Sequence, residues 1–161
     1  MAAITEISQI IADVGAIILE DKLGIEAVSM DNDVSDNKLK SEHITIILQV
    51  IGDIEGQIIC NINRLTCLNL IEQMCGRTNV TLFDDKGWRV LHEFGRLFGQ
   101  GICKKFKEYG LSVYVTKPLI NEGSHMIHSY TGFIMVPLLC SCGFIDVYFT
   151  QHHREEYAEC Q

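Results

Sequence analysis

The chain has 161 residues, of which 47% are hydrophobic and 21% are charged, and its formal net charge at pH 7 is −8. This length suits one domain with a sizeable core, and the composition excludes a long disordered tail. Basic residues are too few to favour a nucleic-acid partner. Because there is no apolar run of about 20 residues and no basic leader, we expect a cytoplasmic protein without a membrane association. We expect residues 1–150 to form a single domain and residues 151–161 to form a charged tail.

The cysteines predict reduced, buried thiols rather than a disulfide framework, because their number is odd and most occupy apolar-periodic positions. Cys140 and Cys142 form the one close pair, and a structural zinc site needs four ligands. The acidic run 31–36 lacks the glycine and the glutamate of a calcium-binding loop, which favours a solvated loop. We therefore expect no metal and no cofactor. The seven cysteines are Cys60, Cys67, Cys75, Cys103, Cys140, Cys142 and Cys160.

The first quarter of the chain begins with a clear helical period of isoleucine and valine. This period predicts an amphipathic helix over residues 4–21 that ends near Gly24. A short strand is expected at 25–30. The following polar and acidic stretch, 31–40, predicts an exposed loop.

Two β-branched runs, 42–51 and 57–62, come next. The five residues between them include two glycines, so the pattern predicts a β-hairpin. Asn63 is a favourable N-cap for a helix that follows the hairpin, and Gly76 is a favourable left-handed end for it. Residues 77–83 are expected to be a link.

The second long helix is expected to begin at Asp84 or Asp85 and to end at Gly110. Gly95 and Gly99 lie beside its apolar face and indicate the close approach of another backbone, because glycine costs about 0.5–1 kcal/mol in a helix interior. At 100° per residue the helix separates into two faces. The apolar face holds Leu91, Phe94, Phe98, Ile102 and Phe106. The polar face holds Arg89, Glu93, Arg96, Gln100, Lys104 and Lys107.

The remainder of the chain predicts strands. Residues 111–116 alternate between apolar and polar, and Pro118 then indicates a sheet edge or a bend. Residues 131–139 and 144–150 flank a turn and predict a second hairpin. Helices beside antiparallel hairpins indicate an α+β fold, an antiparallel β-sheet with helices packed on one face.

Several of these features together resemble the CheX/CheC-like chemotaxis phosphatases. Residues 46–61 resemble the G-D-x-x-G hairpin of that family, and 90–96 occupy the place of its E-x-x-N helix. Residues 109–111 and 116–120 resemble the strand and the proline that follow that helix, and the hairpin around Gly143 resembles the closing strands. The resemblance extends over nearly the whole chain and implies a CheX-like fold that forms a homodimer through sheet edges.

The resemblance also implies a function in bacterial chemotaxis or two-component signalling, the hydrolysis of the aspartyl phosphate of a CheY-type response-regulator receiver. In that family the helix glutamate pairs with the receiver's lysine, and the asparagine three residues later positions the attacking water. Glu93 matches the glutamate, whereas Arg96 replaces the asparagine. A guanidinium group cannot accept a hydrogen bond from water. The magnesium ion would be carried by the receiver.

Gln100 is a candidate substitute for the missing amide. It lies four residues beyond Arg96 on the same face, which places it about 6 Å further along the helix. We therefore identify Glu93 and Gln100 as candidate catalytic residues, and Glu93, Arg96 and Gln100 as candidate partner-binding residues.

Less specific alternatives remain open at this stage. A catalytically lapsed protein that binds a receiver, a structural dimer module, and a solvated ridge without chemistry are each compatible with the same residues. Glu93 and Arg96 are spaced to form a simple surface ion pair. Asp53 and Glu55 resemble turn carboxylates. The remaining histidine candidates are interpreted as exposed side chains in loops and the tail: His125, His128, His152 and His153.

Overall fold

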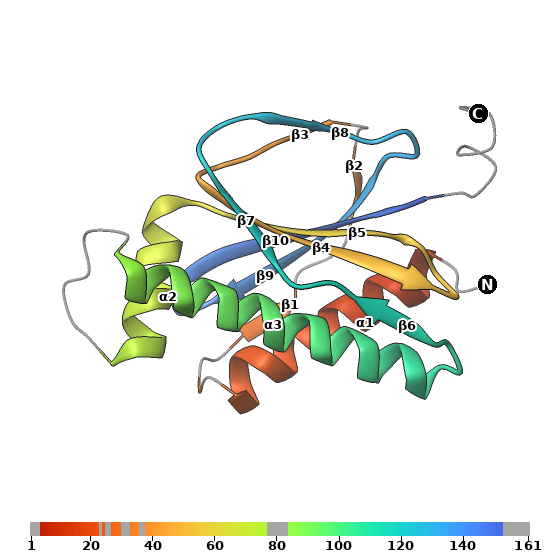
Figure 1. Cartoon of the computed structure of the whole chain (residues 1–161), viewed down its shortest axis with the longest axis horizontal. Helices are drawn as coiled ribbons and strands as arrows, with labels where there is room; N and C mark the ends of the chain where they lie inside the picture. Colours follow the sequence, from red (N-terminus) through yellow and green to blue (C-terminus); the bar gives the residue numbers. More distant parts are fainter. Residues whose placement is uncertain are drawn as a thin grey trace.

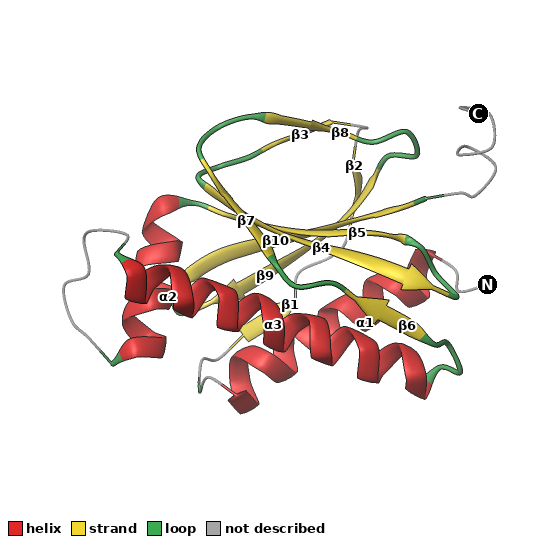
Figure 2. Ribbon diagram, in the orientation of Figure 1, coloured by secondary structure: helices red, strands yellow, loops and turns green. Residues whose placement is uncertain are grey.

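The computed structural model describes residues 4–22, 24, 27–29, 33–35, 38–76 and 84–152. Helices pack against one face of a twisted antiparallel sheet, and a two-stranded ribbon lies on the opposite side (Figures 1 and 2). The predicted α+β architecture is thus confirmed. Within the described residues, no helix combines the length and the apolar character that a membrane span requires.

The main sheet has the strand order β1-β9-β10-β5-β4-β6, with β2 also paired to β9 and β7 also paired to β4. The hairpins β4–β5 and β9–β10 are the two that the sequence predicts. The strands of this sheet are β1 (Ala27–Ser29), β2 (Asp33–Ser35), β4 (Ile44–Gly52), β5 (Gly56–Ile62), β6 (Val113–Val115), β7 (Leu119–Glu122), β9 (Phe133–Cys140) and β10 (Gly143–Gln151).

Among the residues that the structure describes, three helices and one π-helical turn accompany the sheet. The N-terminal helix α1 packs against β9 and α3, and α2 packs against β10 and α3. The predicted apolar face of α3 is confirmed, because all five of its large side chains are at most 1% exposed. The elements are α1 (Ile4–Ile17), the π-helical turn η1 (Ile18–Lys22), α2 (Arg64–Cys75) and α3 (Asp85–Glu108).

The helix ends follow the capping residues that the sequence indicates. The side chain of Asn63 accepts a hydrogen bond from the Thr66 N–H at 2.8 Å, and Gly76 ends α2 with φ 69°. Asp84 caps α3 by accepting from the Gly87 N–H at 2.9 Å. These caps satisfy backbone groups that the helix itself leaves unpaired, which fixes where α2 and α3 begin.

The predicted exposed loop over 31–40 is wrong in part. Residues 33–35 form β2, and β3 (Lys38–Lys40) pairs with β8 (Met126–His128) in the ribbon on the far side of the sheet. The prediction that His128 lies in a loop is therefore also wrong. Leu39 explains the ribbon, because it is 4% exposed and forms a small second core with residues of the sheet.

Asn61 ties the ribbon to the sheet. Its side-chain oxygen accepts from the Glu42 N–H at 2.8 Å, and its amide nitrogen donates to the Lys40 carbonyl at 3.0 Å. By satisfying these two backbone groups, the buried amide fixes the path of the chain between β3 and β4. Hydrophobic periodicity gives no signal for this connection. The expected link 77–83 and all of the expected tail beyond His152 lie outside the described residues, whereas Gln151 ends β10.

Candidate functional site

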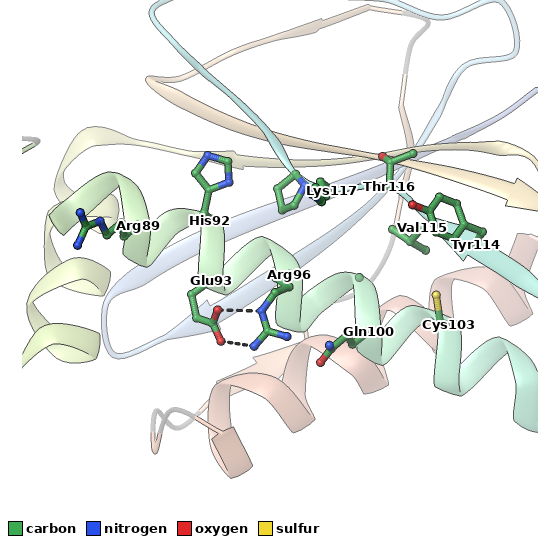
Figure 3. A pocket seen from close by; sticks show the side chains of 12 residues that line it. Arg89, His92, Glu93, Arg96, Gln100, Cys103, Tyr114, Val115, Thr116 and Lys117 are labelled. Carbon is green, nitrogen blue, oxygen red and sulfur yellow. Dashed lines mark hydrogen bonds and ion pairs between the residues drawn. The ribbon is translucent and has the colours of Figure 1, made fainter. Parts of the chain in front are cut away.

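A groove of about 650 Å³ lies between α3 and the segment that leads from β6 to β7 (Figure 3). Helix α3 supplies one wall, and residues 114–118 supply the other. The two walls are far apart in the sequence and are brought together because α3 packs against β6 and β7. The lining residues are Arg89, His92, Glu93, Arg96, Gly99, Gln100, Cys103, Tyr114, Val115, Thr116, Lys117 and Pro118.

Gly95 and Gly99 allow α3 to approach the other wall closely. A methyl group at Gly95 would lie 2.7 Å from Pro118 Cγ and 2.9 Å from Ile46 Cγ2, well inside van der Waals contact. A methyl group at Gly99 would lie 3.1 Å from Val115 Cγ1. The prediction that another backbone approaches here is wrong, because the close neighbours of both glycines are side chains.

The β4–β5 hairpin fixes the beginning of the opposite wall. The Asp53 carboxylate accepts from the Ser112 N–H at 2.7 Å, and the Asp53 N–H donates to the Ser112 carbonyl at 3.0 Å. Gly52 has φ 134°, and a Cβ atom there would lie 2.5 Å from the Ser112 oxygen. Asp53 is therefore more than a turn carboxylate, because it anchors the residue that precedes β6.

Glu93 and Arg96 form a two-pronged ion pair at the groove (Figure 3). Arg96 Nε donates to Glu93 Oε2 at 2.8 Å, and Arg96 Nη2 donates to Glu93 Oε1 at 2.5 Å. The hydrogen bond from Arg96 lowers the pKa of Glu93, and the same bond raises the pKa of Arg96. The side chains of Arg96 and Glu93 are 50% and 45% exposed, so the expected outward carboxylate is confirmed.

Gln100 is exposed and lines the same groove, one turn of α3 beyond Arg96. The structure thus brings together the three site residues that the sequence predicts, Glu93, Arg96 and Gln100. The guanidinium group of Arg96 donates one hydrogen bond to each oxygen of the Glu93 carboxylate. The three side chains retain two kinds of hydrogen-bond acceptor for a binding partner. These are the remaining lone pairs of the Glu93 carboxylate and the amide oxygen of Gln100.

Several groove residues are missed by the sequence analysis. His92 is one residue away from the predicted polar row. Thr116 ends the predicted strand 111–116, and Lys117 enters only through the resemblance of 116–120 to the family. Tyr114 appears only as a polar residue within the predicted strand 111–116. Nothing local to these residues indicates that they face α3, because their placement depends on the packing of β6 and β7.

Cys103 lines the groove, whereas Cys60 and Cys67 lie in the hydrophobic core. Burial raises the pKa of Cys60 to about 12 and that of Cys67 likewise to about 12, which keeps both as neutral thiols. The six cysteines within the described ranges are unpaired, as expected. Across the part of the chain that the structure describes, no three His, Cys, Asp or Glu side chains cluster as a metal site would require.

Comparison with known proteins identifies similar structures but no similar sequence families. No family model matches the sequence, and a search of curated proteins found no match. A CheX chemotaxis protein from Desulfovibrio desulfuricans superposes with a TM-score of 0.81 at 16% identity, over 91% of this chain and 99% of that one. CheX from Vibrio vulnificus superposes with a TM-score of 0.77 at 13% identity, over 89% of this chain and 97% of that one.

A third similar structure is a complex of CheX with CheY, BeF3 and magnesium from Borrelia burgdorferi. It superposes with a TM-score of 0.68 at 17% identity, over 90% of this chain and 97% of that chain. The matches span nearly the full length of each protein, and they agree with the arrangement of sheet, helices and hairpins described above. The chain therefore has the CheX fold.

Proposed function

We propose that this chain binds a CheY-type receiver domain through the α3 side of the groove. The observation that carries the proposal is Glu93, a half-exposed carboxylate at the groove, on the helix where the resembling family places its receiver-contacting glutamate. The Borrelia protein of the same fold was solved together with CheY, which supports a partner of this class.

The ion pair with Arg96 is compatible with this role. A solvent-exposed ion pair is screened by water and contributes little to stability, so Glu93 can exchange Arg96 for a partner's ammonium group at little cost. The lowered pKa of Glu93 keeps the carboxylate ionised throughout the neutral range. Glu93 thus offers a permanent negative charge at a fixed place on a rigid helix.

The test is calorimetric titration of a CheY-type receiver loaded with Mg²⁺ and beryllofluoride, a mimic of its phosphorylated state. The wild-type chain should bind, and Glu93→Ala should weaken the affinity at least about tenfold, as expected when one partner of a charge pair is truncated. Glu122→Ala is the matched control, because Glu122 is also exposed but does not line the groove. Equal affinities of wild type and Glu93→Ala would contradict the proposal.

A second candidate function is hydrolysis of the receiver's aspartyl phosphate, favoured by the exposed amide of Gln100 in the same groove. Glu93 would anchor the receiver, and Gln100 would orient the attacking water. Arg96 would contact phosphoryl oxygens, since its donors suit an anion but cannot accept from water.

Decay of a phosphorylated receiver separates the two functions. Acceleration by wild type that is lost in Gln100→Ala, with binding retained, would support the hydrolase. Acceleration that appears only in Arg96→Asn would identify a binding protein whose catalytic amide has been replaced. If no variant accelerates decay while wild type still binds, the chain is a receiver-binding module.

A further inference from the structure

The exposed face of α3 is basic, although the protein as a whole is acidic. Helix α3 carries six basic and three acidic side chains, a formal charge of +3 in a chain whose total is −8. Because the sign on α3 is opposite to that of the whole molecule, this helix is distinguished electrostatically from the rest of the surface.

The exposed basic residues follow the outward side of the helix and are called the basic stripe here. Arg89, Arg96 and Lys107 fall within about 20° of one another at 100° per residue. The stripe extends over about 31 Å at a rise of 1.5 Å per residue. Its members are Lys86, Arg89, Arg96, Lys104 and Lys107, all exposed.

One carboxylate interrupts the basic stripe, and it is Glu93. The other acidic residues of α3 lie at its two ends, where Asp85 begins the helix and Glu108 pairs with Lys105 at 3.3 Å. Lys117 adds a further exposed cation on the opposite wall of the groove. The surface therefore presents one negative group within a row of positive ones.

We propose that the basic stripe is a docking surface for an acidic face of the receiver, around the contact that Glu93 makes in the proposed function. This inference rests on the proposed function and specifies the charge pattern of the partner. A partner with the complementary pattern has carboxylates or a phosphoryl group around one lysine or arginine. When Glu93 turns to that cation, the Arg96 guanidinium is released to the anionic groups beside it.

Association kinetics with the Mg²⁺–beryllofluoride receiver test the role of the stripe. The double variant Lys104→Glu/Lys107→Glu should lower the association rate constant about tenfold at 50 mM NaCl and change the dissociation rate constant less than twofold, because peripheral charges act mainly on encounter. The control Lys38→Glu/Lys40→Glu makes the same charge change on β3, where both lysines are exposed on the far side of the sheet. Equal rates for the two double variants would overturn the proposal.

A second measurement needs no receiver. A glutamate-rich decapeptide and a version with one central lysine are each titrated into the ¹³C,¹⁵N-labelled chain. Both peptides should shift amide signals along the stripe, and only the lysine version should shift the Glu93 carboxyl signal. Shifts at Lys38 and Lys40 as large as those of the stripe would contradict the proposal.

The two experiments distinguish this proposal from the proposed function. Receiver binding that depends on Glu93 but not on Lys104 and Lys107 would retain the function and overturn the docking surface. Peptide shifts confined to the stripe without receiver binding would retain the charge pattern and overturn the assignment to a receiver.

Discussion

The pairing of Glu93 with Arg96 determines which chemistry the groove offers. An amide three residues after the glutamate would provide both a donor and an acceptor, whereas Arg96 provides donors alone. The same arginine holds the glutamate through two hydrogen bonds and lowers its pKa. Arg96 therefore suits its own position to anionic groups, and the amide of Gln100 is the group of the three that can both donate and accept.

Replacing Arg96 should raise the pKa of Glu93. In Arg96→Gln the guanidinium hydrogen bonds that favour the ionised carboxylate are lost, so the pKa should return towards the ordinary glutamate value of about 4.3. The pH titration of the Glu93 carboxyl ¹³C signal measures this change. Arg89→Gln is the control, since no hydrogen bond joins Arg89 to Glu93, and it should shift the pKa much less.

The sign of the pH dependence follows from the same shift. Because the pKa of Glu93 is lowered in the folded chain, its interaction is present at neutral pH and is lost only when the pH falls through the lowered value. Receiver binding by Arg96→Gln should therefore begin to weaken at a higher pH than binding by wild type. A Glu93 pKa that is the same in both proteins would contradict this account.

At the level of the element, α3 depends on the two glycines of its buried side. Both positions would gain helix propensity from alanine, about 1 kcal/mol. At Gly95 that gain is opposed by contacts below 3 Å with Pro118 and Ile46, whereas at Gly99 the nearest atom is 3.1 Å away on Val115. The same substitution should therefore have different outcomes one turn apart.

Gly95→Ala should destabilise the protein by about 1–3 kcal/mol through overpacking, and Gly99→Ala should be nearly neutral. Urea denaturation followed by circular dichroism measures both free energies of unfolding. Gly99→Ala thus acts as the matched control for helix propensity. Equal stabilities of the two variants would show that α3 moves away from the β6–β7 segment easily.

The sequence predicts α3 well because its signals are local and strong. Five apolar residues keep a helical period, and Asp84 provides a cap at the predicted place. Strands β2, β3 and β8 have three residues each and no comparable period. The positions of β3 and β8 depend on Leu39 entering a core built by Ile59 and Phe133, and on Asn61 bonding to backbone groups about 20 residues away. Strand β2 is placed by its pairing with β9. Such long-range contacts leave no pattern in a single short segment.

For the molecule as a whole, the groove exists only where two distant segments meet, helix α3 and residues 114–118. Glu93, Arg96 and Gln100 were predictable because they share one helix face, but the facing wall was not, since Thr116 and Lys117 carry no signal of their own.

The homodimer through sheet edges stays a prediction. If two chains pair through their sheet edges, light scattering should give twice the chain mass of 18.2 kDa. The mass of a single chain would contradict the predicted homodimer.

Asp53 provides the clearest test of how the whole molecule positions the site. Its carboxylate and its N–H both bind Ser112, which joins the β4–β5 hairpin to the beginning of β6. Asp53→Ala removes the acceptor for the Ser112 N–H, a hydrogen bond to a charged group, and should lower stability by about 1.5–3 kcal/mol. Because β6 continues into the groove wall, the amide signals of Val115 and Thr116 should shift as well.

Asp53→Asn separates the loss of the hydrogen bond from the loss of the charge. Its side-chain oxygen can still accept from the Ser112 N–H, so it should retain most of the stability and smaller shifts at Val115 and Thr116. Receiver affinity should fall in the same order, with Asp53→Ala affected more than Asp53→Asn, although Asp53 does not line the groove. If Asp53→Ala lost stability but kept wild-type signals at the groove wall, the hairpin would support the fold without positioning the site.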